Sequence, residues 1–261
     1  MNQIPEITPE HKRYFLTLAY RGTKYCGWQI QPNAPSVQQT IEDALSVILK
    51  TRTPITGCGR TDTGVHARYY VAHFDSKEDL PPTFINGLNS LLPDDIAIYS
   101  CTAVQSDAHA RFDAFERSYE YHITFRKNPF LNDRAWFYPQ YRQLDSEKMQ
   151  EVASLLPKFK DFRPFCKSDS GLDHYQCDLR DARWEYLPDS TGLIFHISAN
   201  RFLRGMVRLI VGACIQAGKG QLGSEEVHDA LEKQRPLGKN LSVPAHGLFL
   251  TAVRYPYLLN I

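Results

Sequence analysis

The spacing of apolar and polar residues defines the first regular elements of the chain. Apolar and polar side chains alternate over residues 14–20, which predicts a β-strand. Ser36 and Gln39 have the spacing of a capping box at a helix N-terminus. The apolar residues that follow recur at the helical period: Val37, Ile41, Ala44, Leu45 and Ile48. The chain therefore begins with a strand followed by an amphipathic helix.

The same criteria divide the rest of the chain. Further strands are predicted at 68–74, 96–104, 118–126 and 247–255, with a hairpin of 182–187 and 192–198 whose turn contains Asp189, Ser190 and Gly192. Further helices are predicted to begin at Pro81-Pro82, at about Asp145 (ending near Leu156), at residue 205 and at Ser224. The helix from 205 should end at residue 217, because Gly218 and Gly220 follow as a C-cap.

This order of elements predicts an α+β fold with mostly antiparallel, mixed sheets. Strands and helices occur in two coarsely similar rounds. We therefore expect two similar lobes, residues 1–105 and 106–261, that meet along a shared sheet with a central cleft at their junction. A chain of 261 residues is long enough for this arrangement.

Composition and cysteine usage narrow the class of protein. Residues 1–13 are polar and lack the apolar core of a signal peptide, and the best apolar run, 209–214, is too short to span a membrane. The six cysteines are scattered without a CxxC pair, so we expect reduced thiols in a cytoplasmic protein. Cys166, His174 and Cys177 form too loose a cluster to predict zinc, and no metal is expected.

The net charge of +1 gives no overall sign of a nucleic-acid partner, but basic residues gather locally. Three clusters occur: Arg201, Arg204 and Arg208 at helical spacing; Lys158, Lys160, Arg163 and Lys167; and Arg111, Arg117, Arg126, Lys127 and Arg134, interleaved with aromatic residues such as Phe112 and Phe115. Such a mixture suits phosphate contacts and base stacking. Each cluster alone also fits a solvated surface, so both interpretations remain open.

The run from Gly57 to Ala67 is the strongest candidate for chemistry. Its three glycines, at 57, 59 and 64, predict a bent loop that presents Asp62, and Arg60 lies two residues before that carboxylate. An ionised, poorly hydrated aspartate can act as a nucleophile. A turn residue or a structural ion pair would give the same pattern. The residues alone leave these alternatives open.

A second candidate is the strand-like run from Arg117 to Tyr121. Alternation places Arg117, Tyr119 and Tyr121 on one face, which could stack a base and supply a phenol for proton transfer. A half-buried sheet face with one extended arginine explains the same residues. The stretch 212–220 lacks the spacing of a phosphate-binding loop, and no Ser-His-Asp set or pair of matched carboxylates is evident.

Taken together, the motifs resemble the tRNA pseudouridine synthase A family over residues 14–256. The resemblance depends on their joint order: Tyr20-Arg21-Gly22-Thr23-Lys24-Tyr25-Cys26-Gly27-Trp28-Gln29, Ser36-Val37-Gln38, Gly59-Arg60-Thr61-Asp62-Thr63-Gly64-Val65-His66-Ala67, His109-Ala110-Arg111-Phe112, Arg117-Ser118-Tyr119-Glu120-Tyr121, Met206-Val207-Arg208 with Val211-Gly212, and Gly247-Leu248-Phe249-Leu250.

The resemblance implies an isomerase that converts uridine to pseudouridine at positions 38, 39 and 40 of the tRNA anticodon arm. It also implies the two-lobed pseudouridine synthase fold, a homodimer and no metal or organic cofactor. The base would have to leave its stack to react. The resemblance does not say whether the nucleophile attacks the sugar C1′ or the uracil ring.

The same resemblance assigns roles to individual residues. Asp62 matches the catalytic nucleophile, and Arg60 and Arg208 match the basic partners of that aspartate. Tyr119 matches the active-site tyrosine. Substrate would contact Tyr119, Leu248, Arg111 and Phe112. The basic residues would contact the wider RNA, through Arg60, His109, Arg111, Lys127, Arg201 and Arg204, although Arg201 and Arg204 match no catalytic position of the family. Thr63 replaces a more usual alanine, and the segment 166–177 departs most from the family pattern.

Two other functions remain open from the sequence. A tRNA-binding protein without chemistry would use Asp62 only as a structural ion-pair residue. A glycosyl hydrolase or lyase would act on small molecules instead. Release of the C5 hydrogen from uridine in tRNA distinguishes the isomerase from the tRNA-binding protein. Reaction of free nucleosides identifies the hydrolase or lyase.

Overall fold

Nine strands form one continuous mixed sheet in the computed structural model, which describes residues 11–167, 174–188, 190–238 and 240–257. The strands are β1 (Lys12–Tyr20), β2 (Thr56–Gly57), β3 (His66–Ser76), β4 (Ile96–Val104), β5 (Glu116–Thr124), β6 (Trp136–Phe137), β7 (Leu179–Tyr186), β8 (Gly192–Ala199) and β9 (Leu248–Arg254). Their order is β4-β1-β3-β9-β5-β8-β7, with β2 beside β3 and β6 beside β5. The predicted α+β class is confirmed.

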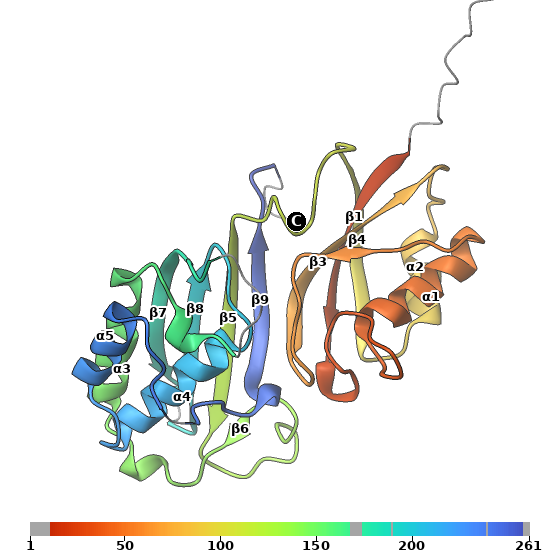
Figure 1. Ribbon diagram of the computed structural model, residues 1–261. Coiled ribbons are helices and arrows are strands. Elements are labelled where there is room, and N and C mark those ends of the chain that lie inside the picture. Colours follow the sequence, from red (N-terminus) through yellow and green to blue (C-terminus); the bar gives the residue numbers. More distant parts are fainter. Residues whose placement is uncertain (1–10, 168–173, 189, 239, 258–261) are drawn as a thin grey trace, which may run out of the picture.

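The last strand of the chain joins the two halves of this sheet (Figure 1). β9 pairs antiparallel with β5 over most of its length, but it pairs parallel with β3 only at His66↔Phe249 and Ala67↔Leu250. Apart from the parallel pair β5–β6, the other neighbours are antiparallel. The β3–β9 ladder is short, and β3 begins where the two halves of the sheet join.

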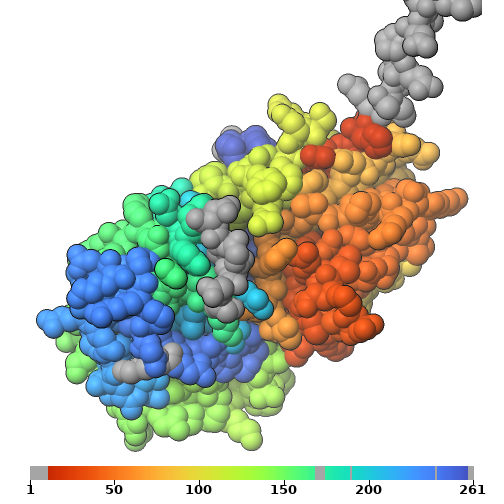
Figure 2. Space-filling view, viewed as in Figure 1, coloured from red at the N-terminus to blue at the C-terminus, as the bar shows by residue number. Residues whose placement is uncertain are grey.

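The helices form two groups, one beside each half of the sheet (Figure 1). α1 (Val37–Leu49) and α2 (Phe84–Leu91) lie near β1 and β4, and α3 (Ser146–Leu155), α4 (Met206–Gly218) and α5 (Ser224–Glu232) lie near β5, β7 and β8. Each group covers its own apolar core. Tyr119 packs against both cores. Figure 2 shows the two halves in contact along a seam.

Several helix ends differ in detail from the predictions. The Ser36 hydroxyl accepts from the Gln39 amide as expected, but the Gln39 side chain bonds Asp43 and does not complete the capping box. α2 starts at Phe84, after Pro81-Pro82, and the N-cap of α5 is Gly223, because the Ser224 hydroxyl bonds Glu151 instead. α4 includes Gly218, one residue beyond the predicted end, and closes as expected at Gly220, which is left-handed at φ 69°, with the Gln221 amide bonded to the Gln216 carbonyl.

Other predictions match closely or cannot be compared. Strands 14–20, 68–74 and 96–104, the hairpin and the helix from Asp145 all form. Asp189 in the hairpin turn lies outside the described residues, as do residues 168–173 of the divergent segment. Within the described ranges, no helix has the length and apolar character needed to cross a membrane.

Candidate active site

The Asp62 loop, residues 58–65, connects β2 to β3 at the centre of the sheet. Its first part is fixed by the Cys58 amide, which donates to the Val71 carbonyl at 2.8 Å, and by the buried Tyr70 hydroxyl, which donates to the Gly59 carbonyl. The Val65 amide donates back to the Asp62 carbonyl at 3.1 Å. The loop is bent as predicted, with Asp62 at its turn and its side chain 30% exposed.

The run from Tyr20 to Gln29 supports this loop from one side. The Tyr20 hydroxyl is 2.9 Å from the Thr61 hydroxyl. A Cβ atom at Gly27, which has a φ of 87°, would lie 2.1 Å from the Thr61 carbonyl oxygen, and one at Gly22 would lie 2.0 Å from the Val65 carbonyl oxygen. Only glycine allows this close backbone contact. The sequence revealed the glycines but not their contact with the Asp62 loop.

Arg208 pairs with Asp62 from the other half of the molecule. Its Nη1 lies 3.2 Å from Asp62 Oδ2, and its Nε donates to the Val243 carbonyl at 2.7 Å. The Arg208 side chain is only 15% exposed, in the first turn of α4. Gly212 allows residue 241 to approach this helix, since a Cβ there would lie 1.7 Å from the Leu241 carbonyl oxygen. These contacts orient the Asp62 carboxylate.

Two expectations about the arginines are wrong. Arg60 was expected to hold Asp62, but it is exposed and makes no ion pair with any described residue. Arg201, Arg204 and Arg208 do not share a helix face, because α4 begins only at Met206, after the left-handed Gly205. Proximity in sequence suggested both ideas, whereas Asp62 finds its partner 146 residues away.

Tyr119 lies beside the Asp62 loop, in the first half of β5. Its ring packs edge-on against Phe202 with centroids 5.1 Å apart. Burial raises the pKa of the Tyr119 phenol, and the Asp62 carboxylate raises it further. The phenol is therefore protonated before substrate binds, so it can donate or relay a proton but is not a resident phenolate base. The predicted division of faces holds: Glu120 and His122 pair at 2.9 Å with each other.

The predicted substrate and RNA contacts differ in exposure. Leu248 begins β9 within the second core and is buried. The connection loop, residues 105–115 between β4 and β5, carries His109, Arg111 and Phe112. Phe112 is 74% exposed, with the Arg111 guanidinium 5.7 Å from its ring centre. Lys127 and Arg204 are exposed, and Arg201 lies 3.2 Å from His174 Nε2.

His66 is a structural residue of the site that sequence reasoning missed. Its Nδ1 accepts from the Gly22 amide at 3.1 Å, so its Nε2 carries the proton and donates to the His246 carbonyl, also at 3.1 Å. Burial lowers the pKa of this imidazole, consistent with the neutral form. His66 thus ties the end of the Asp62 loop to both halves. A single histidine beside a strand gives no pattern that would have revealed this.

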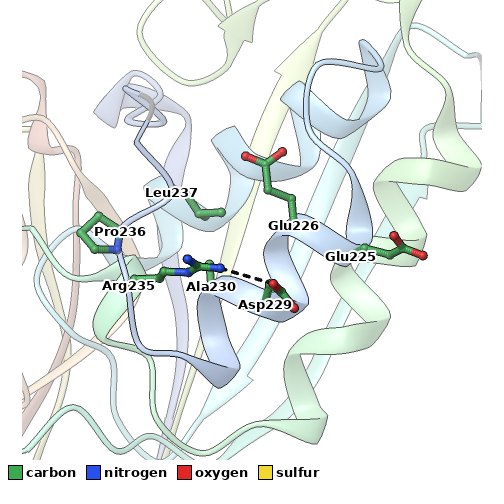
Figure 3. Close-up of a pocket in the computed structure, with 7 residues that line it drawn as sticks. All are labelled: Glu225, Glu226, Asp229, Ala230, Arg235, Pro236 and Leu237. Atoms are coloured by element: carbon green, nitrogen blue, oxygen red, sulfur yellow. Dashed lines mark hydrogen bonds and ion pairs between the residues drawn. The ribbon is translucent and has the colours of Figure 1, made fainter.

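Other chemically notable groups do not form a competing site. Burial raises the pKa of the Cys58 thiol to about 11, which makes it a poor nucleophile. Figure 3 shows a hollow beside α5, lined by Glu225, Glu226, Asp229, Ala230, Arg235, Pro236 and Leu237. Its three carboxylates would repel phosphate, and Asp229 is already paired with Arg235 at 3.3 Å. This hollow does not fit an RNA site.

Potential metal ligands come together at one place on α5 within the described residues. Among the described residues, the ligand atoms that come together are those of His228, Asp229 and Glu232 on α5, not those of Cys166, His174 and Cys177. Asp229 in that group also bonds Lys233. The group is an exposed acidic cluster that already has cationic partners.

Asp62 on its glycine-rich loop and Arg208 on α4 thus form a part-buried ion pair where the two halves of the sheet meet. A family model described as "tRNA pseudouridine synthase" matches residues 17–113 and 159–256. The chain therefore belongs to the tRNA pseudouridine synthase family. The matched segments include Asp62 and Arg208, whereas Tyr119 lies between them.

Individual relatives agree with this family over nearly the full length of the chain. The chain is 46% identical over 247 residues to tRNA pseudouridine synthase A of Porphyromonas gingivalis, covering 94% of this chain and 97% of that protein. It is 45% identical to the protein of the same name from Azobacteroides pseudotrichonymphae, with the same coverage. The corresponding protein of Bacteroides thetaiotaomicron is 44% identical, with 94% and 91% covered.

Proposed function

We propose that this protein isomerises uridine to pseudouridine at positions 38, 39 and 40 of the tRNA anticodon arm, with Asp62 as the nucleophile. The observation that carries the proposal is the Asp62–Arg208 pair at 3.2 Å, both of whose residues lie within the family's matched segments. Relatives named tRNA pseudouridine synthase A support tRNA as the substrate.

The reaction conserves atoms and electrons. The N1–C1′ glycosidic bond breaks, the uracil turns, a C5–C1′ bond forms, and the proton on C5 is lost while N1 gains one. Asp62 forms a covalent bond either to C1′ or to the ring and is released when the product forms. Because the isomerisation is redox-neutral, the proposed route calls on no organic cofactor. Tyr119 would stack on the base and relay the proton.

We further propose that the tRNA arm lies between two lobes, residues 1–105 and 106–261. Support comes from the two separate apolar cores and from Asp62 and Arg208, which reach the site from different halves. Arg111 and Phe112 on the exposed connection loop would contact the RNA, together with Arg60, Lys127, Arg201 and Arg204. The homodimer implied by the family resemblance stays a prediction.

The test is tritium release from unmodified bulk tRNA labelled at C5 of uridine, under single-turnover conditions. We expect release by the wild-type protein and none above background by Asp62→Asn, because the amide is nearly isosteric but cannot attack. In a filter-binding titration, the tRNA affinity of Asp62→Asn should be within a few-fold of the wild-type affinity. Asp62→Asn activity within tenfold of wild type would exclude Asp62 as the nucleophile.

The same assay separates the alternative functions. A tRNA-binding protein without chemistry would bind the RNA and release no tritium in either variant. A small-molecule glycosyl hydrolase would instead act on free uridine and release uracil. Sequencing of the reacted tRNA for pseudouridine then tests the three positions directly.

A further inference from the structure

Arg117 makes more backbone contacts around the site than its place on an ordinary strand requires. Its Nη1 donates to the carbonyls of Ala114 at 2.6 Å and Asn200 at 2.7 Å. Its Nη2 donates to the carbonyls of Cys58 at 2.9 Å and Arg111 at 2.6 Å. The four N–H groups of the two terminal nitrogens are thereby all used.

The four carbonyls belong to three segments that each carry a proposed functional side chain. Cys58 begins the Asp62 loop, and Arg111 and Ala114 belong to the connection loop that exposes Phe112. Asn200 leads into the segment that ends with Arg208 on α4. Cys58 and Asn200 lie 59 and 83 residues from Arg117 in sequence. One guanidinium therefore fixes the spacing of the three segments.

We propose that Arg117 is a positioning residue that sets the place of Asp62 relative to the RNA-contacting loop and to Arg208, through its four bonds to backbone carbonyls. This inference rests on the proposed isomerase function. The planar guanidinium is suited to this task because its donors form a rigid fork, whereas a lysine ammonium is a single point with three donors. Arg117 acts through the backbone and does not touch the reacting atoms.

The geometry also separates Arg117 from the RNA-binding arginines. Its terminal N–H groups are already bonded to carbonyls, so a phosphate would have to displace them. Arg204, by contrast, has an exposed side chain. Loss of a phosphate contact flattens the slope of log affinity against log salt by ~0.7–0.9. Loss of Arg117 should leave that slope unchanged.

The experiment compares Arg117→Met and Arg117→Lys with two controls. Val152→Ala opens a space in the second core on α3, away from the site, and reports what general destabilisation does. Arg204→Ala removes the same charge from an exposed position. Each variant is assayed for single-turnover tritium release at saturating tRNA, for tRNA affinity across a salt series, and for amide hydrogen exchange.

We expect Arg117→Met to lower the single-turnover rate by ~10²-fold, the usual cost of misplacing a reacting group by about 1 Å. The rate of Arg117→Lys should be closer to that of Arg117→Met than to the wild-type rate. In both variants, tRNA affinity should change much less than the rate. Hydrogen exchange should rise in both the Asp62 loop and the connection loop, and Val152→Ala should produce neither effect at a temperature where it is folded.

Several results would overturn the assignment. Arg117→Met could keep a single-turnover rate within threefold of wild type, or Val152→Ala could lose as much rate as Arg117→Met. Arg117→Met could also flatten the salt slope of tRNA affinity while its rate stays unchanged. Unchanged exchange in the two loops would overturn it whether or not the wild type is active. A wild type that releases no tritium refutes the proposed function instead, so the two failures are distinguishable.

Discussion

The Asp62 loop and the connection loop meet at Arg117 but are stabilised in different ways. The backbone at Gly22 and Gly27 packs closely against carbonyl groups of the Asp62 loop. The Arg208 side chain pairs with the Asp62 carboxylate. Side chains anchor the connection loop: His73 Nδ1 accepts from the Ala110 amide, His109 Nδ1 accepts from the Arg111 and Phe112 amides, and the Tyr255 hydroxyl donates to the Ala110 carbonyl. The first loop holds its functional side chain in place, and the second leaves Phe112 exposed.

This contrast fits the different demands of chemistry and binding. A nucleophile gains from being fixed before the substrate arrives, because misplacement by about 1 Å can cost 10²-fold in rate. A stacking or phosphate-binding side chain tolerates more freedom, since the RNA itself completes the geometry. We therefore expect substitutions in the Asp62 loop or its supports to affect turnover, and substitutions in the connection loop to affect mainly RNA binding.

After Asp62 itself, Tyr119, which touches both apolar cores beside the Asp62 loop, gives the largest expected effect on turnover. Its hydroxyl makes no hydrogen bond to any described residue, so it is free to engage substrate. Tyr119→Phe keeps the ring and should lower the single-turnover rate by ~10²–10⁴, the range of proton-transfer catalysis. Tyr119→Ala, which also loses stacking, should be slower still. A Phe variant close to wild type would limit Tyr119 to stacking, and an active Ala variant would refute both roles.

Gly27 and Gly59 provide a matched pair for the support of the Asp62 loop. Gly27→Ala combines a left-handed backbone with a contact of 2.1 Å to the Thr61 carbonyl, one residue before Asp62. We expect a loss of more than about 2 kcal/mol in unfolding free energy, from the left-handed conformation and overpacking together. Turnover should fall about 10²-fold, because the nucleophile is displaced.

A Cβ at Gly59 meets no atom within 4 Å, so Gly59→Ala should leave the unfolding free energy nearly unchanged. Urea denaturation of both variants, with single-turnover rates at a temperature where each is folded, makes the comparison. Equal stability of the two variants would mean that the loop is not supported through Gly27.

Local patterns predicted the elements of the fold because strand and helix periods are properties of neighbouring residues. The Ser36 helix and the strands at 68–74 and 96–104 formed where expected. Asp62 was identifiable for the same reason, since its glycines and its arginine lie within one short run. The error at Arg201 and Arg204 shows the limit: helical spacing indicates a shared face only where a helix exists, and α4 begins after them.

Long-range partners were beyond the reach of pattern reasoning. Residue order favoured Arg60 as the partner of Asp62, but tertiary packing supplies Arg208; only the family resemblance had suggested that residue. The partners of Arg117 and His66 are mainly backbone carbonyl and amide groups, which every residue possesses, so no sequence signal can mark them. Candidate side chains for the site were therefore easier to find in the sequence than the groups that hold them.

The smallest expected effect concerns pH and the connection loop. His73 is 7% exposed, and its pKa is lowered to about 4, chiefly by burial, with Arg13 and His109 acting in the same direction and Asp75 and Asp113 opposing it. The unfolded chain binds a proton near pH 6.5 that the folded state accepts only near pH 4. The stability due to neutral His73 is therefore complete above pH 6.5 and is lost as the pH falls toward 4.

This linkage predicts that His73 contributes about 2 kcal/mol to the fall in unfolding free energy between pH 7 and pH 5. His73→Asn keeps an acceptor for the Ala110 amide but cannot titrate in this range. It should be less stable than wild type at pH 7, because the ring contacts with Phe15 and His109 are lost. Urea denaturation at both pH values should nevertheless give the variant a smaller pH dependence. Equal pH dependence in the two proteins would show that His73 does not hold the connection loop as a neutral acceptor.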